Sequence, residues 1–247
     1  MADLGLSQKR VLVTGASRGI GLGIAKAFAD AGARVALLAE TDDVIAAASG
    51  IGTAHVCDLT APTAIAALDT GPLDILINNA GLEFETRLDD PQSAATVDHM
   101  LMLNVAGMFR LTQKVLPDLV DGGAIVNTAS VWGRSAPAGF SGYAASKHGV
   151  IGLTRAWSRE LSARSIRVNA VCPGWVGTDA ALRSLHVMAE RRGVPPATIQ
   201  AEIEGTQDIP GFMTPADVAS LYLFLASPLA SNITGQAINV DRGELQV

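Results

Sequence analysis

The stretch Arg10–Phe28, RVLVTGASRGIGLGIAKAF, decides the fold of this chain. It begins with a β-branched run, Arg10–Thr14, turns at the glycines 15, 19 and 21, and continues with apolar residues at helical spacing. Glycines let a backbone come close to a pyrophosphate, and a helix N-terminus supplies N–H donors to it. The spacing G-x-x-x-G-x-G departs from the G-x-G-x-x-G fingerprint, so the turn alone is weak support for a nucleotide site.

Further apolar runs follow at regular intervals and alternate with helical patterns. They predict strands at Arg34–Ala39, Thr53–Cys57, Leu73–Ile77, Ala124–Thr128, Ile166–Val171 and Ala237–Val240. Near-continuous apolar strands separated by helices indicate a parallel sheet covered on both faces. We therefore expect an α/β, Rossmann-type, doubly wound parallel sheet of about seven strands. No repeat or linker interrupts the pattern, so residues 1–247 are expected to form a single domain.

Composition narrows the function classes. The chain has 247 residues, 49% of them hydrophobic and 17% charged, with a formal net charge of −6. That charge argues against a nucleic-acid partner, whose affinity depends on neutralising phosphates. Apolar runs such as residues 221–226 are too short to span a membrane, and the N-terminal residues show no secretory signal, so we expect a cytoplasmic protein. Cys57 and Cys172 are expected to be buried free thiols rather than a disulfide or a metal site.

A second stretch, Thr128–Lys147 (TASVWGRSAPAGFSGYAASK), carries candidate chemistry. A strand opens onto Ser130, and a following helix puts Tyr143 and Lys147 four residues apart on one face. A free tyrosine titrates near pH ~10, so a base that works near neutrality needs a shift worth roughly 4 kcal/mol. A cation ~4 Å away supplies about that much at an effective dielectric of ~20. The stretch suits proton transfer at an alcohol or carbonyl.

The helical pattern over residues 97–116 has an apolar stripe, and Asn104 lies beside that stripe. A buried asparagine is either a satisfied core amide, a group that orients a water, or the site of a local kink. The helix that begins near Tyr143 carries small residues on one side, which permits close approach of a second subunit.

Together these motifs resemble those of the short-chain dehydrogenase/reductase family. The matching segments are Thr14–Gly21, Asn78–Gly81 (NNAG), Asn104, Ser130, Tyr143 with Lys147, and Pro173–Gly174, in the family's order over nearly the whole chain. The resemblance implies a nicotinamide-dependent oxidoreductase. It also implies a homotetramer built through the helices that hold Asn104 and Tyr143.

The resemblance assigns roles at the matching positions. Tyr143 would be the acid/base, Lys147 would lower its pKa and hold the nicotinamide ribose, and Ser130 would polarise the reacting oxygen. Asn104 would position water in a proton relay. The expected cofactor contacts are Gly15, Ser17, Arg18, Gly19, Ile20, Glu40, Asp58, Leu59, Asn79, Ala80, Gly81, Tyr143, Lys147, Pro173, Gly174, Val176 and Thr178.

The choice of cofactor depends on the end of the second predicted strand. Glu40 would repel a 2′-phosphate and accept from a ribose hydroxyl, which favours NAD. However, the acid stands one place later than the Asp usual in NAD-dependent members, where this chain has Ala39. Arg18 either pairs with a phosphate or is solvated. NAD is the expected cofactor, with NADP as the alternative.

The substrate side is expected in a lid over residues 179–210, which resembles the lid of 3-hydroxybutyrate dehydrogenases. Candidate substrate contacts are Glu83, Trp132, Arg134, Phe140 and Trp175. Trp132 and Phe140 stand where those enzymes use polar groups to hold a carboxylate. Glu83 either binds hydroxyl groups of a polyol or faces water, and Arg134 either binds an acid or is an exposed loop residue.

The expected function is therefore hydride transfer between nicotinamide and a small secondary alcohol or ketone, such as a sugar derivative, a polyol or a hydroxy acid. No metal is expected. Two alternatives remain on this fold: an NADPH-dependent ketoacyl-type reductase, and a non-catalytic cofactor-sensing or scaffold protein.

Overall fold

The architecture comes from a computed structural model that describes residues 4–246. Seven parallel strands form one sheet in the order β3-β2-β1-β4-β5-β6-β7. Their bounds are β1 Arg10–Thr14, β2 Arg34–Ala39, β3 Gly52–Val56, β4 Leu73–Asn78, β5 Leu119–Thr128, β6 Arg167–Pro173 and β7 Ala237–Val240. The predicted fold class is confirmed. The strand order reverses between β1 and β4, which is where doubly wound sheets open a ligand crevice.

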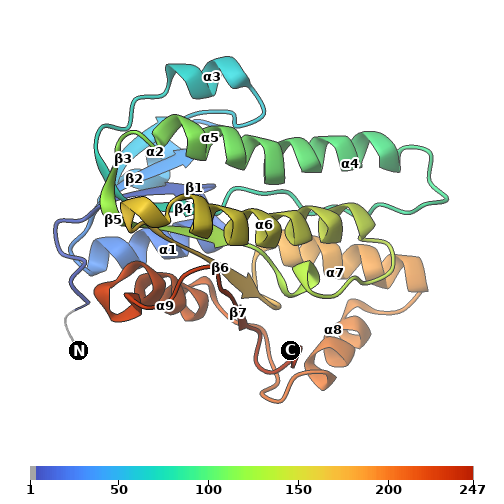
Figure 1. The fold of residues 1–247 in the computed structure, drawn as a ribbon. Helices are drawn as coiled ribbons and strands as arrows, with labels where there is room; N and C mark the ends of the chain where they lie inside the picture. Colours follow the sequence, from blue (N-terminus) through green and yellow to red (C-terminus); the bar gives the residue numbers. More distant parts are fainter. Residues whose placement is uncertain (1–3, 247) are drawn as a thin grey trace.

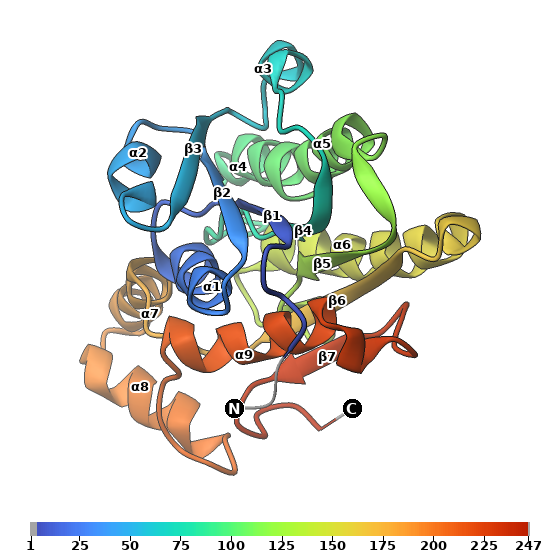
Figure 2. The same ribbon diagram turned by 90° about the vertical axis from the view of Figure 1, so that its left-hand side faces the viewer.

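Helices cover both faces of the sheet (Figures 1 and 2). Their bounds are α1 Gly19–Asp30, α2 Asp43–Ala48, α3 Pro62–Ala67, α4 Ser93–Leu101, α5 Met108–Val115, α6 Ser141–Glu160, α7 Asp179–Arg192, α8 Pro196–Gly205 and α9 Pro215–Ala226. Helices α1, α2 and α9 pack on one face, and α5 and α6 pack on the other, where α3 lies against α5. Helices α7 and α8 lie together beyond the end of β6 (Figure 1).

The central strand β1 shows why the strands read as continuous apolar runs. Val11 and Val13 belong to the core under α1 and α9, whereas Leu12 belongs to the core under α5 and α6. All three side chains are almost inaccessible to solvent. A strand buried on both faces cannot alternate apolar with polar residues.

Two strands extend beyond their predicted bounds by two residues or more. β5 begins at Leu119 rather than at residue 124, and its register against β4 shifts between Leu73 and Ile75. Gly122, at φ 76°, lies in this irregular part. β6 continues to Pro173 because Cys172 and Pro173 align with β7. Both extensions depend on a neighbouring strand, which the local pattern does not reveal.

The helical pattern over residues 97–116 is not one α-helix. Helix α4 passes into a π-helix, Met102–Gly107, before α5 begins. Gly107 lies where a Cβ atom would come within 2.6 Å of the carbonyl oxygen of Leu59, so this turn packs directly on backbone. Asn104 lies in the π-helix, and its amide is satisfied by hydrogen bonds to the main chain and a hydroxyl.

Two other expectations concern the whole chain. Cys57 and Cys172 are buried and unpaired among the described residues, as predicted. Over residues 4–246, no helix combines the length and apolar character that a bilayer crossing requires.

Candidate active site

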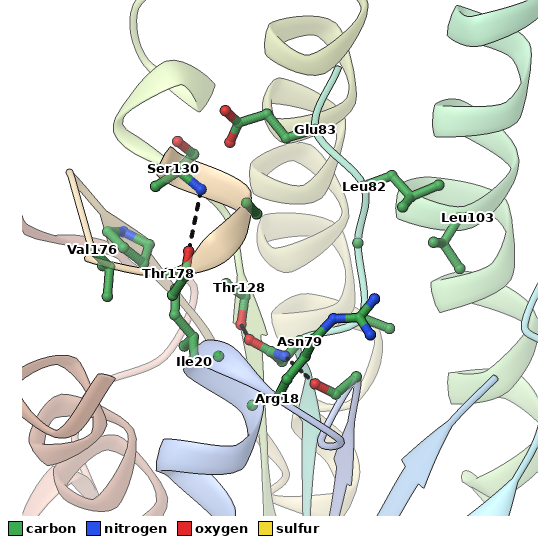
Figure 3. A pocket seen from close by; sticks show the side chains of 18 of the residues that line it. Arg18, Ile20, Asn79, Leu82, Glu83, Leu103, Thr128, Ser130, Val176 and Thr178 are labelled. Carbon is green, nitrogen blue, oxygen red and sulfur yellow. Dashed lines mark hydrogen bonds between the residues drawn. The ribbon is translucent and has the colours of Figure 1, made fainter. Parts of the chain in front are cut away.

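A cavity of about 290 Å³ opens at the carboxyl ends of the strands, where the strand order reverses. Its wall comes from the turn after β1, the end of β2, the turn after β4, the end of β5, the start of α6 and the segment 173–183. Figure 3 shows Glu83 and Ser130 together at one end, and Arg18, Ile20 and Asn79 toward the other. We call the end with Glu83, Trp132 and Trp175 the substrate end, and the end with Gly15, Gly19 and Ile20 the phosphate end.

The phosphate end is a cradle that only glycine can form. Gly15 and Gly19 have φ values of 62° and 57°, and a Cβ at Gly21 would overlap the carbonyl oxygen of Gly15. The N-cap residue of α1, Arg18, makes no side-chain cap hydrogen bond among the described residues. The N–H groups of the first helical turn therefore remain available, and they fit the pyrophosphate of a dinucleotide.

The floor of the crevice is tied together by Thr14. Its Oγ1 accepts from the backbone N–H groups of Asn79 and Ala80, both at 2.9 Å, and the Asn79 amide donates back to the Thr14 carbonyl at 3.0 Å. A Cβ at Gly15 would come within 2.8 Å of the Ala80 Cα. The turns after β1 and β4 therefore meet backbone to backbone.

Arg18, in the turn after β1, and Glu40, at the end of β2, are both exposed and both belong to the cavity wall. Cys57 and Leu59 also belong to the wall, but Asp58 between them does not. The Asp58 carboxylate accepts from the backbone N–H and the hydroxyl of Thr60, each at 2.7 Å. The contact of Asp58 with adenine stays a prediction.

Ser130, Tyr143 and Lys147 meet in the cavity wall, as the motif spacing predicted. Each is at least nine-tenths buried. Ser130 Oγ accepts from the Trp132 backbone N–H at 3.1 Å, which fixes the hydroxyl at the end of β5. Lys147 Nζ donates to the Thr128 carbonyl oxygen at 2.8 Å and lies 5.6 Å from the centroid of the Tyr143 ring.

The electrostatics of this group differ from the sequence-based expectation. Burial raises the pKa of Tyr143 well above its ordinary value, the Glu83 carboxylate raises it further, and a hydrogen bond with Ser130 lowers it. Burial also lowers the pKa of Lys147 to about 8, against an opposing effect of Glu83. Burial therefore outweighs the other influences on the pKa of Tyr143 in this structure, and the expected effect of Lys147 on that pKa stays a prediction. A neutral phenol is the form that donates a proton to a ketone oxygen.

Asn104 lies behind the cavity wall. Its Oδ1 accepts from Leu82 N–H at 2.8 Å, and its Nδ2 donates to the Leu82 carbonyl at 2.9 Å and to Ser146 Oγ at 3.0 Å. A Cβ at Gly81 would meet Asn104 Oδ1 at 3.2 Å and Lys147 Nζ at 3.5 Å. The asparagine thus clamps the backbone beside Glu83 to the helix that carries Lys147.

The structure divides the substrate candidates. Glu83, Trp132 and Trp175 line the cavity, whereas Arg134 and Phe140 do not. Phe140 packs behind Trp132 with ring centroids 4.9 Å apart. The Arg134 guanidinium donates to the Ala237 carbonyl oxygen on β7. Substrate contact by Arg134 or Phe140 stays a prediction.

Glu83 is the carboxyl group of the substrate end. Burial raises its pKa, while contact with the Ser184 hydroxyl and the charges of Lys147 and Arg183 lower it. A carboxyl group in this position can accept hydrogen bonds from ligand hydroxyl groups.

Several wall residues were not selected from the sequence: Leu38, Cys57, Leu103, Thr128, Ala129, Asp179 and Arg183. Leu38, Cys57 and Thr128 stand at or just beyond the carboxyl ends of strands, so the parallel-sheet rule could have found them. No sequence signal marks Leu103 or Arg183, because the position of Leu103 depends on how the π-helix packs and that of Arg183 on how α7 packs.

Comparison with known proteins gives concordant matches. The family model described as Enoyl-(Acyl carrier protein) reductase matches residues 15–244. The chain is 34% identical to the D-beta-hydroxybutyrate dehydrogenase of Cupriavidus necator over 96% of this chain and 98% of that protein. It is 35% identical to the 3-oxoacyl-(acyl-carrier-protein) reductase of Vibrio cholerae over 97% of this chain and 98% of that protein.

A solved structure is similar over the same length. The aldohexose dehydrogenase of Thermoplasma acidophilum in its ligand-free form superposes with a TM-score of 0.85 at 31% identity. The match covers 97% of this chain and 95% of that chain.

Proposed function

Because the chain belongs to the short-chain dehydrogenase/reductase family of oxidoreductases acting on CH–OH groups, we propose that it is an NAD-dependent dehydrogenase of small, neutral secondary alcohols with several hydroxyl groups. The observation that carries this proposal is the position of Glu83, in the same cavity wall as Ser130 and Tyr143. A carboxyl group beside the reacting centre accepts hydroxyl donors and disfavours an anionic substrate.

The residues have separate tasks in this reaction. When bound, the nicotinamide cofactor accepts or supplies the hydride. Tyr143 exchanges a proton with the substrate oxygen, and the Ser130 hydroxyl donates a hydrogen bond to the same oxygen. Lys147, held by the Thr128 carbonyl, places a positive charge beside the phenol and the ribose position. Asn104 fixes the Leu82 backbone and thereby the direction of Glu83.

The proposed preference for NAD rests on Glu40. Its carboxylate belongs to the cavity wall at the end of β2, where a ribose 2′-substituent lies in doubly wound folds. A 2′-phosphate would be repelled there, whereas a 2′-hydroxyl could donate to the carboxylate. Arg18 in the same wall is the group that would attract a phosphate instead, so the two residues have opposing effects on the choice.

The aromatic surface of the substrate end also supports a polyhydroxylated ligand. Trp132 and Trp175 meet edge to face with centroids 5.8 Å apart, and Phe212 stacks on Trp175 at 5.6 Å. Such rings bury the C–H face of a sugar or polyol while Glu83 binds its hydroxyl groups. The structural likeness to an aldohexose dehydrogenase favours the same substrate class.

One observation favours a second candidate, a small hydroxy acid. Arg183 belongs to the cavity wall and could pair with a substrate carboxylate. The relative from Cupriavidus necator is named for D-beta-hydroxybutyrate. The two candidates differ in which of Glu83 and Arg183 contacts the substrate.

A spectrophotometric panel tests the proposal. Polyols, aldoses, simple secondary alcohols and hydroxy acids are followed at the nicotinamide band, with NAD and NADP, for the wild type and for Glu83→Gln and Arg183→Gln. We expect turnover of neutral polyhydroxylated alcohols that Glu83→Gln weakens at least tenfold in kcat/KM and Arg183→Gln leaves within about twofold. Preference for hydroxy acids, lost in Arg183→Gln, would establish the second candidate instead.

We infer that the protein assembles as a homotetramer through the π-helical region and α6. Leu101, Met102 and Phe109 expose apolar surface there, and Gly152 on α6 faces open space. Apolar side chains beside a small-residue helix face suit a packed interface. Sedimentation showing a monomer at micromolar concentration would contradict this inference.

A further inference from the structure

Two acidic residues that follow the β4 turn both face helix α7. Glu83 and Glu85 are partly buried, while Phe84 between them is exposed, so the segment alternates its sides. Glu83 contacts the Ser184 hydroxyl, and Glu85 Oε1 accepts from Arg191 Nη1 at 2.7 Å. Ser184 and Arg191 are seven residues apart, which puts them about two turns apart on one helix face.

The outer of these contacts is a partly buried ion pair. The side chains of Arg191 and Glu85 are 28% and 22% exposed, so this pair is more shielded than the pair of Arg192 with Glu202, whose side chains are 43% and 50% exposed. The Arg191 guanidinium lies over Gly139, where a Cβ would overlap Nη1. Gly139 has a φ of 88°, which also favours glycine. The pair therefore occupies a niche shaped to receive it.

The segment that carries Glu85 is hydrogen-bonded to the start of α6, the helix that carries Tyr143 and Lys147. Thr86, next to Glu85, donates its N–H to the Gly139 carbonyl at 2.6 Å. Thr86 Oγ1 accepts from Gly142 N–H at 2.9 Å, and the Ser141 hydroxyl donates to the Thr86 carbonyl at 3.1 Å. Through Thr86, Glu85 is thus held beside the first two residues of α6, Ser141 and Gly142, which directly precede Tyr143.

Among the ion pairs of residues 4–246, Arg191–Glu85 alone joins α7 to the body of the domain. The next residue, Arg192, pairs with Glu202 and so joins α7 only to α8. The apolar contact of α7 is made by Leu185 and Ala189 against the aromatic cluster around Trp132. Apolar packing alone does not fix the orientation of α7, because it is non-directional, whereas the ion pair has a defined geometry that does.

We propose that Glu85 and Arg191 are positioning residues that hold α7 over the substrate end of the cavity. The consequence for substrate binding rests on the proposed function. Neither residue lines the cavity, so they act through α7, which carries Arg183 into the wall and Ser184 against Glu83. When the pair opens, α7 loses its ion pair with the segment that presents Glu83. When the pair closes, the substrate end is complete.

The test combines hydrogen–deuterium exchange over residues 179–192 with steady-state kinetics on the full-length protein. Glu85→Gln and Arg191→Gln each remove the charge pair, and Arg192→Gln is the matched control because it breaks only the α7–α8 pair. We expect exchange of α7 amides to rise about two- to fivefold in the first two variants, and substrate KM to rise by a similar factor. Cofactor Kd, read from nicotinamide fluorescence, should stay unchanged.

Exchanging the two charged residues distinguishes loss of the ion pair from general structural damage by a substitution. The double variant Glu85→Arg with Arg191→Glu restores the attraction and should return both exchange and KM toward wild-type values. Exchange no faster than in Arg192→Gln, no restoration in the double variant, or raised exchange with an unchanged KM would each overturn the proposal. Failure of the proposed function would instead appear as absence of turnover in the wild type, and the exchange comparison would still decide whether the pair holds α7.

Discussion

Lys147 Nζ donates a 2.8 Å hydrogen bond to the main-chain carbonyl of Thr128, the last residue of β5. This bond fixes the ammonium to the sheet rather than to the phenol, since Nζ lies 5.6 Å from the Tyr143 ring centroid. The strand that presents Ser130 therefore also orients the lysine. Helix α6 and strand β5 set the three groups relative to one another.

Replacement of the phenol tests the proposed acid/base. Tyr143→Phe should lower kcat by about 10³-fold, because a positioned acid/base contributes roughly 10²–10⁴ to the rate. Cofactor affinity measured by nicotinamide fluorescence should change little. Tyr222→Phe is the matched control, since Tyr222 is the other tyrosine of the chain, is buried, and pairs with Thr128 Oγ1 at 2.8 Å behind the cavity. Near-normal turnover in Tyr143→Phe would show that another group moves the proton.

Burial of Lys147 predicts a dependence of stability on pH. Its pKa falls from 10.5 to about 8 in the folded protein. Between these values the folded state has lost a proton that the unfolded state keeps, so the free energy of unfolding rises with pH across this window. The contribution is present above pH 10.5 and is lost as the pH falls through about 8.

Lys147→Met should remove this rise, a difference of up to about 3 kcal/mol between pH 8 and 10. Chemical denaturation at fixed protein concentration measures it. The raised pKa of Tyr143 makes the free energy of unfolding fall with pH, but mainly above 10.0, the ordinary pKa of a free tyrosine. The measurement therefore stays below that pH. Parallel pH profiles for wild type and variant would mean that the lysine is better solvated than the structure indicates.

Glu40 is the residue expected to control cofactor choice. Glu40→Gln should raise the ratio of kcat/KM for NADP to that for NAD by about tenfold, because it removes the charge that repels a 2′-phosphate. The side chain is exposed, so screening limits the effect and added salt should reduce it. Asp42→Asn, an exposed acid outside the cavity wall, is the control. An equal ratio in Glu40→Gln and wild type would exclude Glu40 from cofactor selection.

Asn104 is expected to contribute mainly to the stability of the fold. Asn104→Ala leaves the Leu82 N–H and carbonyl without their partners, and it should cost about 2–3 kcal/mol in the free energy of unfolding. Asn232→Ala, at an exposed position, should cost less than about 0.5 kcal/mol. If kcat falls steeply while stability is unchanged, Asn104 acts in proton transfer, as the family resemblance implies.

Sequence patterns predicted the sheet and the meeting of Ser130, Tyr143 and Lys147 because both depend on short-range spacing. Apolar runs mark doubly buried strands, and a four-residue spacing puts two side chains on one helix face. Asp58, Phe140 and Arg134 were predicted at the site but do not line the cavity, and each contacts another residue of the protein. Asp58 binds Thr60, Phe140 packs on Trp132, and Arg134 reaches the Ala237 carbonyl.

Other features depend on contacts between distant segments. The π-helix ends at Gly107, which packs closely on the Leu59 backbone, and a spacing rule for α-helices predicts neither feature. The Tyr143 pKa depends on burial and on Glu83, which lies sixty residues earlier in the chain. The spacing of Tyr143 and Lys147 predicted their proximity, but the degree of desolvation follows only from the packed cavity.

The contact between Gly15 and Ala80 has a consequence for how this site can change. Because the two turns touch backbone to backbone, the width of the phosphate end is set by main-chain atoms and by glycine itself. The substrate end is set by side chains, among them Glu83, Trp132 and Trp175, and α7 adds Arg183 to the wall. Substitutions at the substrate end can therefore alter which substrate binds, while the phosphate end keeps its shape. One end of the cavity is free to diversify and the other is not.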